Sequence, residues 1–530
     1  MKIKPLYFLL FLALAFSACK KTAEFRLAQD LGPTSVDTTY TSDRDKNLTL
    51  VYFIPADLDT LAGWHKRLSD VFIYGQSYFG NNMQARGYGY KTYGLLKDDS
   101  LNLVKIVVIK GNLPKESYPY QGGVGNVVLE VNAYKTAHPA EFTSQHMLVI
   151  MPAHKYSADG NPGGVPFYGY GKWAFLLDYP DLNINYMGVN TPQARRAVGW
   201  IAANFHEMAH ALNVPHGSGK VSDVTNPALG YSLMGNGMRK FIDNQSFLTE
   251  ADCAILNVNE VFQANNSISY YQPVTASIRR IVARYDALSG NIEVGGRFQS
   301  SVNVANVIYY LDPNVGNEGT GTNNDYNAVT WRSEVIGQDS FKVSLPINEL
   351  FYTGNYAYEL KVKLVHQNGA VSPSIYYFDF VNDVPNINLR YEYEKTGWSI
   401  IAQSSQESSY PASNIIDGKI NTYWRSKYSS GTPAVLPHSF RGDMVAARSI
   451  KGVSFLQRAD GQKPVKDFEI QFSNSASTGF VSAGAFVAAD KPGYQYFDLS
   501  LPVTARYFRL VVTSNRDGTN DSAIGEFGLY

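Results

Sequence analysis

Cysteine and unbalanced charge are both scarce in this chain. Two cysteines, Cys19 and Cys253, serve 530 residues, so the fold must rely on packed cores and not on a disulfide framework. Lys plus Arg and Asp plus Glu number 46 each, which gives a formal net charge of zero. No basic stripe is present in the sequence. This balance argues against nucleic acid, and against a membrane held by charge, as partners.

A long hydrophobic run is also missing near the start of the chain. The apolar stretch from Leu6 to Phe16 is too short for a comfortable membrane span. Lys2 and Lys4 precede it, and Ser17-Ala18-Cys19 follows it. This pattern resembles a bacterial lipoprotein signal with its lipobox, which implies cleavage before Cys19 and acylation of that cysteine. An ordinary secretory signal and an uncleaved anchor are the alternatives.

The resemblance implies a lipid-anchored protein of the bacterial cell envelope, on the periplasmic or the surface face of the outer membrane. Residues 1–18 would be the signal peptide, and the polar residues 19–45 a tether between lipid and domain. Cys253 would then be the single remaining thiol, so no disulfide within the chain is expected. The length of the chain suggests three or four domains.

Histidine is rare as well, yet it is concentrated in one place. Three of nine histidines fall within eleven residues, where His206, Glu207 and His210 form H-E-x-x-H and His216 follows six residues later. Residues four apart on a helix lie on one face, so His206 and His210 can point at a single ion. Catalytic zinc takes three protein ligands and keeps one position open. The window therefore predicts a zinc site formed by His206, His210 and His216.

The third ligand requires the chain to turn back after the helix. Asn213 tolerates the left-handed conformation that closes a helix, and Pro215 prevents the helix from resuming. Glu207 lies beside the first ligand, where its carboxylate can take a proton from an attacking water. We therefore expect Glu207 to be the general base, and then the general acid, of a hydrolytic reaction.

The helix that carries these residues is predicted from its start and its period. Thr191 is a good N-cap, and Pro192 suits the first helical position. An apolar stripe of helical period follows: Ala194, Val198, Ile201, Phe205, Met208 and Leu212. The stripe predicts a helix that is buried on one side and presents its histidines at the rim.

The pattern H-E-x-x-H-x-x-N-x-x-H resembles the zinc signature of the metzincin metalloendopeptidases. That family also has a methionine turn beneath the metal, and Met234 in Tyr231 to Gly237 is similar to it. The resemblance implies an α+β zinc endopeptidase domain over residues 46–268. Asn236 stands where some subfamilies keep a tyrosine, so no tyrosine role is carried over. For Met234, ordinary core packing is the alternative.

The order of elements before the signature fits this domain. Leu48 to Ile54 predicts a strand, Leu61 to Met83 a helix, and 103–109 and 147–151 further strands. The Gly-rich stretch from Gly163 to Gly171 has two interpretations. It is an edge strand lining a peptide cleft, or a surface loop, and the loop is the preferred one.

Residues 269–388 change to short alternating strands separated by Gly, Asn and Asp turns. This pattern predicts an immunoglobulin- or fibronectin-like β-sandwich. It contains no recognisable site chemistry, so we expect it to act as a spacer.

The final block, residues 395–530, resembles a discoidin domain, also called coagulation-factor type C. The resemblance rests on Pro411 to Trp424, Val465 to Ile470, Ala505 to Val512, and Ile524 to Phe527. It implies a jelly-roll β-sandwich that binds galactose-type glycans or other surface ligands. It also implies a structural calcium ion held by Asp417, Thr422 and Glu526, with a metal-free turn as the alternative.

Three residues of this block are candidates for glycan contact. They are Trp424, Arg425 and Arg458, since aromatic faces stack on sugars and Arg supplies forked donors. Core packing is the more common role of the tryptophan at the position of Trp424.

The sequence thus predicts a multidomain protein, with an α+β metzincin-like domain followed by two β-sandwich domains. The expected function is that of a zinc endopeptidase that cleaves extracytoplasmic proteins, with glycoproteins or mucins as the favoured substrates because of the glycan-binding module. The alternative is a non-catalytic surface adhesin with a structural metal site, which the intact Glu207 disfavours. A glycosidase is disfavoured because no acidic pair is recognisable.

Overall fold

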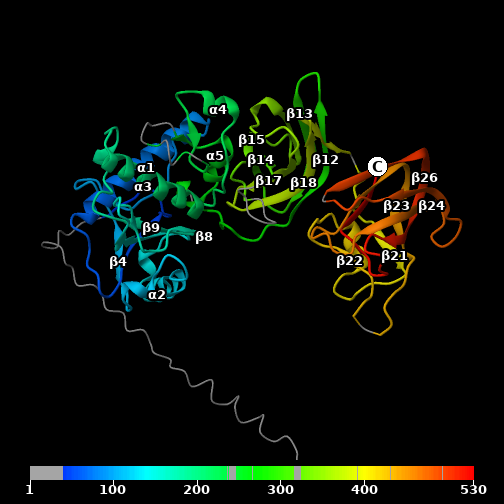
Figure 1. The fold of residues 1–530 in the computed structure, drawn as a ribbon, viewed down its shortest axis with the longest axis horizontal. Helices are drawn as coiled ribbons and strands as arrows, with labels where there is room; N and C mark the ends of the chain where they lie inside the picture. The colour runs from blue at the N-terminus through cyan, green and yellow to red at the C-terminus, as the bar shows by residue number, and fades with distance from the viewer. Residues whose placement is uncertain are drawn as a thin grey trace, which may run out of the picture.

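The computed structural model describes residues 40–235, 237, 241, 246–264, 267–315, 324–390, 392–429, 431–491 and 493–530. The expected signal peptide, Cys19 and residues 19–39 of the tether lie outside this range. The chain is multidomain and mostly β, and its three parts follow one another in space as they do in sequence (Figure 1). Within the described residues, no helix has both the length and the apolar character needed to cross a membrane.

The first part is built on a five-stranded sheet of order β4-β1-β5-β9-β8. Four of its strands, β4, β1, β5 and β9, run parallel to one another. The inner strands β1 and β5 and the neighbouring β9 are buried along nearly their whole length, as expected of a parallel sheet covered by helices. The strands are β1 (Thr49–Ile54), β4 (Ile106–Lys110), β5 (Met147–Pro152), β9 (Trp173–Asp178) and β8 (Tyr168–Tyr170). The edge strand β8 is antiparallel to β9.

The Gly-rich stretch from Gly163 to Gly171 therefore includes an edge strand. The preferred interpretation as a surface loop was wrong for its last residues, since Tyr168 to Tyr170 pair with β9. Short strands β2 (Lys97–Asp98), β3 (Leu103–Val104), β6 (Lys155–Tyr156) and β7 (Pro162–Gly163) form two small hairpins beside the main sheet.

The described residues of the first part form the α-helices α1 (Trp64–Ala85), α2 (Val124–Ala137), α3 (Pro192–Ala211), α4 (Val221–Thr225) and α5 (Glu250–Asn257). The predicted start of α3 is confirmed, because the Thr191 hydroxyl accepts the N–H of Ala194 at 3.1 Å. The expected apolar stripe of α3 is fully buried, from Ala194 through Phe205 to Leu212. The helix is thus fixed against the sheet along one side, and its histidines lie at the edge of that contact.

The middle part consists of two antiparallel sheets with a common core between them. One sheet has the order β16-β13-β12-β20, and the other β15-β14-β17-β18-β19. The strands are β12 (Ala276–Asp286), β13 (Asn291–Ser300), β14 (Val304–Pro313), β15 (Val329–Ser333), β16 (Ser340–Pro346), β17 (Ala357–His366), β18 (Val371–Val381), β19 (Val384–Asn386) and β20 (Asn388–Leu389).

Strand β14 is buried on both of its faces. Val307, Tyr309 and Leu311 lie in the core of the sandwich. Ile308 and Tyr310, on the opposite face, belong to the core of the first part. Side chains alternate between the faces of a strand, so one strand serves two cores. The middle and first parts are therefore joined by a continuous apolar interface.

The last part is an antiparallel sandwich with a core of its own, which includes Trp424, Phe440 and Phe468. Its main sheet has the order β21-β23-β26-β24-β25, and β28 also pairs with β23. The strands are β21 (Ser399–Gln403), β22 (Trp424–Arg425), β23 (His438–Leu456), β24 (Val465–Ser473), β25 (Val481–Val487), β26 (Tyr494–Asn515), β27 (Ala523–Ile524) and β28 (Glu526–Leu529).

Candidate metal centre

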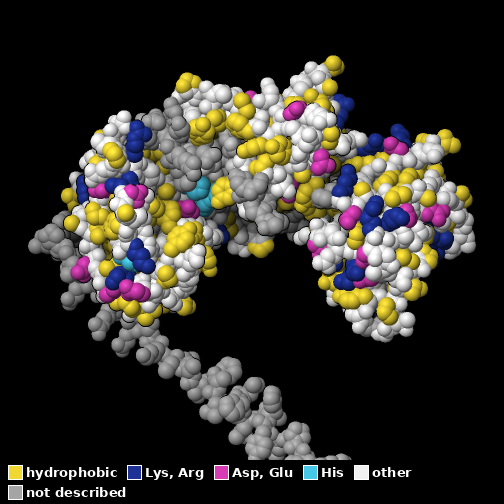
Figure 2. Space-filling view, viewed as in Figure 1, with side chains coloured by type: hydrophobic (Ala, Val, Ile, Leu, Met, Phe, Trp, Pro, Cys, Tyr) yellow, Lys and Arg dark blue, Asp and Glu magenta, His cyan; other side chains and the backbone are white. Residues whose placement is uncertain are grey.

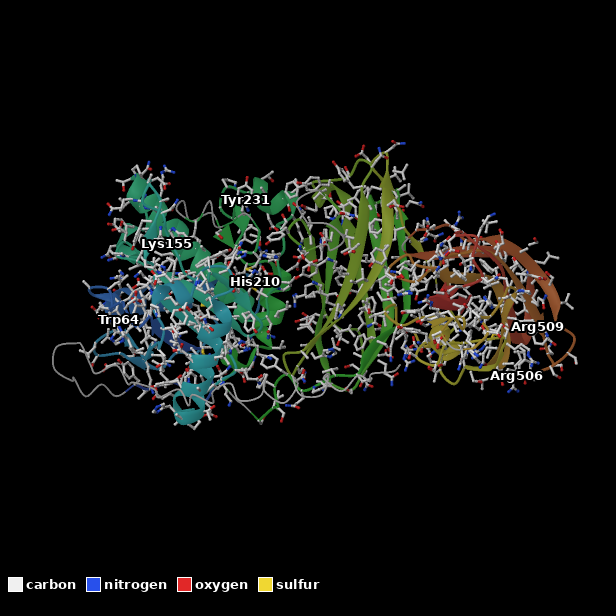
Figure 3. The ribbon with its side chains drawn as sticks, turned by 60° about the horizontal axis from the view of Figure 1, so that its bottom comes forward. Trp64, Lys155, His210, Tyr231, Arg506 and Arg509 are labelled. Atoms are coloured by element: carbon white, nitrogen blue, oxygen red, sulfur yellow. The ribbon has the colours of Figure 1, made fainter. Side chains whose placement is uncertain are left out.

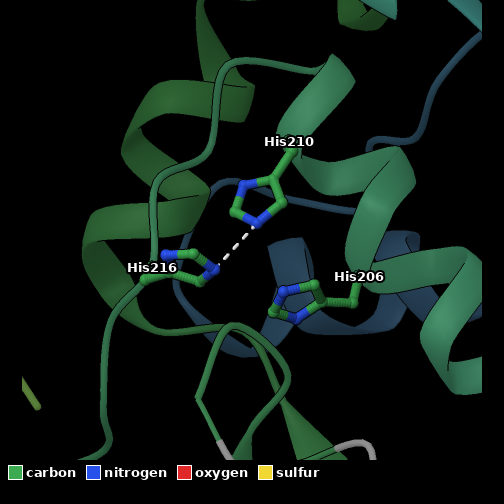
Figure 4. A group of neighbouring side chains, drawn as sticks. All are labelled: His206, His210 and His216. Atoms are coloured by element: carbon green, nitrogen blue, oxygen red, sulfur yellow. Dashed lines mark hydrogen bonds between the residues drawn. The ribbon is translucent and has the colours of Figure 1, made fainter. Parts of the chain in front are cut away.

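The three histidines of the zinc pattern come together at the end of α3. His206 and His210 stand one turn apart, and the chain then reverses so that His216 returns to them (Figure 4). The reversal occurs at Asn213, which has the positive φ of 70° that the sequence predicted. The N–H of Val214 then donates to the carbonyl of Ala209 at 3.0 Å and closes the turn. The ligand atoms of the three histidines all lie within 4.8 Å of one another.

A backbone carbonyl faces Nδ1 of each histidine. Nδ1 of His206 donates to Leu233 at 2.8 Å, that of His210 to Val214 at 2.9 Å, and that of His216 to Asn324 at 3.2 Å. A carbonyl oxygen can only accept, so each Nδ1 must carry the proton. In a neutral ring, Nε2 then carries an unprotonated lone pair.

The Nε2 atoms of His210 and His216 lie 3.0 Å apart. Two lone pairs at this distance repel each other unless a cation lies between them. Nitrogen ligands on a tetrahedral zinc ion are about 3.3 Å apart, given a Zn–N distance of about 2.05 Å. Burial lowers the pKa of His206 to about 3 and that of His216 to about 4, so both rings are neutral at pH 7. The donor set therefore fits a zinc ion.

Glu207 lies on α3 next to the first of these ligands. Burial raises its pKa to about 7, although the backbone N–H of Gly169 donates to it and opposes the shift. A carboxylate that titrates near neutrality can both accept and return a proton. Gly169 is on β8, so the edge strand and the carboxylate are in direct contact.

Met234 is fully buried in the core of the first part. The adjacent carbonyl of Leu233 holds His206, and the carbonyl of Met234 accepts the N–H of Gly217 at 3.3 Å. The turn around Met234 thus fixes the segments of two histidines through its backbone. Asn236 lies outside the described residues.

Two groups that contact His216 come from the middle part, and neither was predicted from the sequence. The carbonyl of Asn324 accepts from His216, and the ring of Tyr326 stacks on the imidazole with 3.7 Å between centroids and 24° between planes. Residues 269–388, expected to act as a spacer, thus contact one of the three histidines. His216 and Asn324 are 108 residues apart in the sequence, so no local sequence pattern around His216 could predict their contact.

The expected calcium residues of the last part also come together, but in a different arrangement. The carboxylate of Asp417 accepts the Thr422 hydroxyl at 2.9 Å. Glu526 is fully buried, and its Oε1 accepts the N–H groups of Gly418 and Lys419 at 2.7 and 3.0 Å. Its Oε2 lies 2.5 Å from Nζ of Lys395.

Oε2 of Glu526 is paired with Lys395, and Oε1 accepts two backbone N–H groups. A calcium ion held by Asp417, Thr422 and Glu526 would therefore compete with Lys395 for Glu526. The calcium site stays a prediction.

The three expected glycan contacts have different environments. Trp424 is fully buried and meets Phe440 edge-on at 4.5 Å, so it belongs to the core and is corrected as a sugar contact. Arg425 pairs with Asp521 at 2.7 Å and lies over the ring of Tyr428. Arg458 lies 4.0 Å from the ring centroid of Tyr423. The two arginines stay predictions.

The candidate zinc site and the last part are separated by the sandwich. Histidine side chains reach the surface where the first part meets the sandwich (Figure 2). His210 lies on that side of the first part, whereas Arg506 and Arg509 lie beyond the sandwich (Figure 3).

Known proteins are similar to two portions of the chain. Residues 399–527 match the F5/8 type C domain family. The chain is 31% identical over 118 residues to a sialidase of Micromonospora viridifaciens, which covers 22% of this chain and 18% of the sialidase. It is 26% identical over 140 residues to a galactose oxidase of Gibberella zeae, which covers 26% of this chain and 20% of the oxidase. The chain thus spans about a fifth of the length of these curated relatives.

A longer similarity is to the solved structure of OgpA from Akkermansia muciniphila. The two proteins are 30% identical with a TM-score of 0.59, and the match covers 64% of this chain and 94% of that one. A catalytically inactive OgpA, with the same identity and TM-score, has been solved in complex with an O-glycopeptide substrate, glycodrosocin. The chain therefore belongs to the family of OgpA and carries an F5/8 type C domain at residues 399–527.

Proposed function

We propose that this protein is a zinc-dependent endopeptidase of metzincin type that cleaves O-glycosylated proteins or peptides. The observation that carries the proposal is the convergence of three histidines whose ligand atoms all lie within 4.8 Å of one another, with Glu207 next to the first of them on α3. His206, His210 and His216 would hold the zinc ion, and Glu207 would move the proton.

A bound zinc ion would lower the pKa of water to about 7 and polarise the scissile carbonyl. The chain's own residues supply the remaining steps. Glu207 takes the proton of the attacking water and then delivers it to the leaving amine nitrogen as the C–N bond breaks. The N–H of Gly169 orients the carboxylate for this exchange.

The edge strand β8 supports a peptide substrate. It is the last strand of its sheet, and its Gly169 contacts both Glu207 and His210. An extended peptide added antiparallel to such an edge would place a backbone carbonyl beside the histidines. We therefore expect β8 to align the substrate backbone.

The substrate class rests on the similarity to OgpA, whose inactive form binds an O-glycopeptide. The F5/8 type C domain adds a second site of glycan binding in this proposal, with Arg425 and Arg458 as its candidate contacts. Tethering to glycans would raise the local concentration of cleavable chain.

The test uses the full chain, an O-glycosylated peptide and the same peptide without its glycan. The wild type is expected to bind one zinc ion per chain and to cleave the glycosylated peptide. Glu207→Gln is expected to keep zinc and lose roughly 10² to 10⁴-fold in kcat/KM. His210→Ala is expected to lose both zinc and cleavage.

The matched control is Glu116→Gln, the same chemical change at a carboxylate that is 67% exposed. It should leave zinc content and cleavage unchanged. A wild type that binds zinc yet cleaves no peptide or protein would instead favour the adhesin, in which the metal is structural.

Localisation belongs to the same proposal. We expect residues 1–18 to be removed and Cys19 to be lipidated, which anchors the protein in the cell envelope. Growth with a labelled fatty acid should label the wild type and leave Cys19→Ser unlabelled; equal labelling of both would contradict the anchor.

A further inference from the structure

The third histidine differs from the other two in what holds it. The carbonyls that accept from His206 and His210 belong to the first part of the chain. The carbonyl that accepts from His216 belongs to Asn324 of the middle sandwich. His216 alone is also covered by an aromatic ring, that of Tyr326, among the ring contacts of the described residues.

The backbone that follows His216 is docked on the same sandwich. The N–H of Ser218 donates to the carbonyl of Ala328 at 2.7 Å, and Ser218 forms a parallel bridge with Val329 of β15. A side chain on Gly217 would meet Thr330 at 3.4 Å. Residues 216–218 thus lie against the edge of the middle sandwich.

Buried charges fix the segment that carries Asn324 and Tyr326. Asp325 lies between these two residues with a φ of 66°, and its carboxylate pairs with Lys361 and with Lys363, the latter at 2.9 Å. Nζ of Lys363 lies 3.5 Å from the ring centroid of Tyr310, a residue of the core shared with the first part. The segment is therefore anchored to the rigid strands β14 and β17.

We propose that the middle sandwich completes the metal centre, with Tyr326 and the Asn324 carbonyl as positioning groups for His216. This inference rests on the proposed zinc site. The carbonyl fixes the tautomer that leaves Nε2 free for the metal, and the stacked ring limits rotation of the imidazole. Groups that orient a histidine ligand in this way affect metal affinity roughly 10- to 100-fold when they are removed.

The experiment measures zinc affinity of the full chain by competition with a chelator. Tyr326→Leu removes the ring, whereas Tyr326→Phe keeps the ring and removes only the hydroxyl. We expect zinc to bind Tyr326→Leu at least tenfold more weakly and to leave it faster, and Tyr326→Phe to bind as the wild type does. Tyr326 is 44% exposed, so neither change should alter the unfolding temperature of the metal-free chain.

Tyr428→Leu is the matched control, since Tyr428 is 41% exposed and lies in the F5/8 type C domain. It should bind zinc as the wild type does. Wild-type zinc affinity in Tyr326→Leu would overturn the inference, and so would an equal loss in Tyr326→Phe. A wild type that binds zinc but cleaves nothing would contradict the proposed activity alone, because the zinc affinities of the variants can still be compared. A wild type that binds no zinc overturns both.

Discussion

At the scale of single residues, two buried carboxyl groups, those of Glu526 and Asp252, affect the stability of the folded chain. Lys395 neutralises Glu526 inside the last part, and Asp252 caps α5 at the interface between the first part and the sandwich. Burial of an ionisable group is costly unless a partner compensates it. Glu526 has a countercharge in Lys395, whereas Asp252 has a hydrogen bond from Thr249 but no ion pair among the described residues.

Lys395→Met is expected to destabilise the F5/8 type C domain by about 3–5 kcal/mol, because it leaves Glu526 buried without its countercharge. Urea unfolding of the full chain measures this loss. Lys451→Met, at an exposed lysine on β23, is the control and should have little effect. Unfolding of the wild type with and without calcium tests the predicted calcium site: stabilisation by calcium would support it, and no change would contradict it.

Asp252→Asn is expected to stabilise the chain at neutral pH. Burial raises the pKa of Asp252 to about 6, and no partner for its Oδ1 is found among the described residues. A folded-state pKa above the unfolded value of 3.8 means that stability is lost as the pH rises from about 4 through 6. The loss is roughly 3 kcal/mol above pH 6, at about 1.4 kcal/mol per pKa unit.

The asparagine keeps an oxygen that can accept the Thr249 N–H, as Asp252 does at 2.8 Å. Unfolding measured at pH 4 and at pH 7.5 separates the effect of the charge of Asp252 from the effect of its hydrogen bond. The increase in the stability of Asp252→Asn over the wild type should appear only at pH 7.5. An equal gain at both values would mean that titration of Asp252 is not its cause.

At the scale of elements, local signals were sufficient for α3 and insufficient for β14. The cap at Thr191 and the apolar period of 192–212 act within a few residues, so they predicted the helix and its buried side. Asn213 likewise announced the turn. For β14, the alternating pattern of residues 269–388 predicted strands but did not show that both faces of this one are buried.

The residues of the candidate site also fall into those that local sequence predicts and those that it does not. His206 and His210 were fixed by helical spacing, and His216 by the turn that follows. The stacking of Tyr326 on His216 and the pairing of Lys395 with Glu526 depend on contacts between distant segments. Such contacts follow from the packing of whole sheets, which single-sequence patterns do not contain.

Gly169 on β8 gives a prediction at this scale. A Cβ atom there would lie 2.6 Å from Cβ of His210, so Gly169→Ala must push β8 away from α3. We expect kcat/KM to fall roughly 10- to 100-fold, because small displacements at a reacting centre are costly. Gly163→Ala, in the same segment but with nothing within 4 Å of its added carbon, should behave as the wild type. Equal activity of both variants would contradict a role for this close approach.

At the scale of the whole molecule, the core of the first part includes Ile308 and Tyr310 of β14, whereas the sandwich and the F5/8 type C domain each have a core of their own. His216, the third of the proposed metal ligands, and the following Ser218 contact the sandwich. Metal binding should therefore stabilise the strands β14 and β15 of the sandwich as well as the first part. It should stabilise the last part much less.

Removal of zinc tests this division. Zinc at a hundred times its Kd adds about 2.7 kcal/mol to the stability of the unit that binds it. Hydrogen exchange should therefore speed up on chelation in α3 and in β14 together, and stay unchanged in β24 of the F5/8 type C domain. His210→Ala, which lacks a ligand, should show no effect of the chelator in any segment. If α3 responds while β14 does not, the sandwich is not part of the metal-binding unit, and its strands only lie beside the centre.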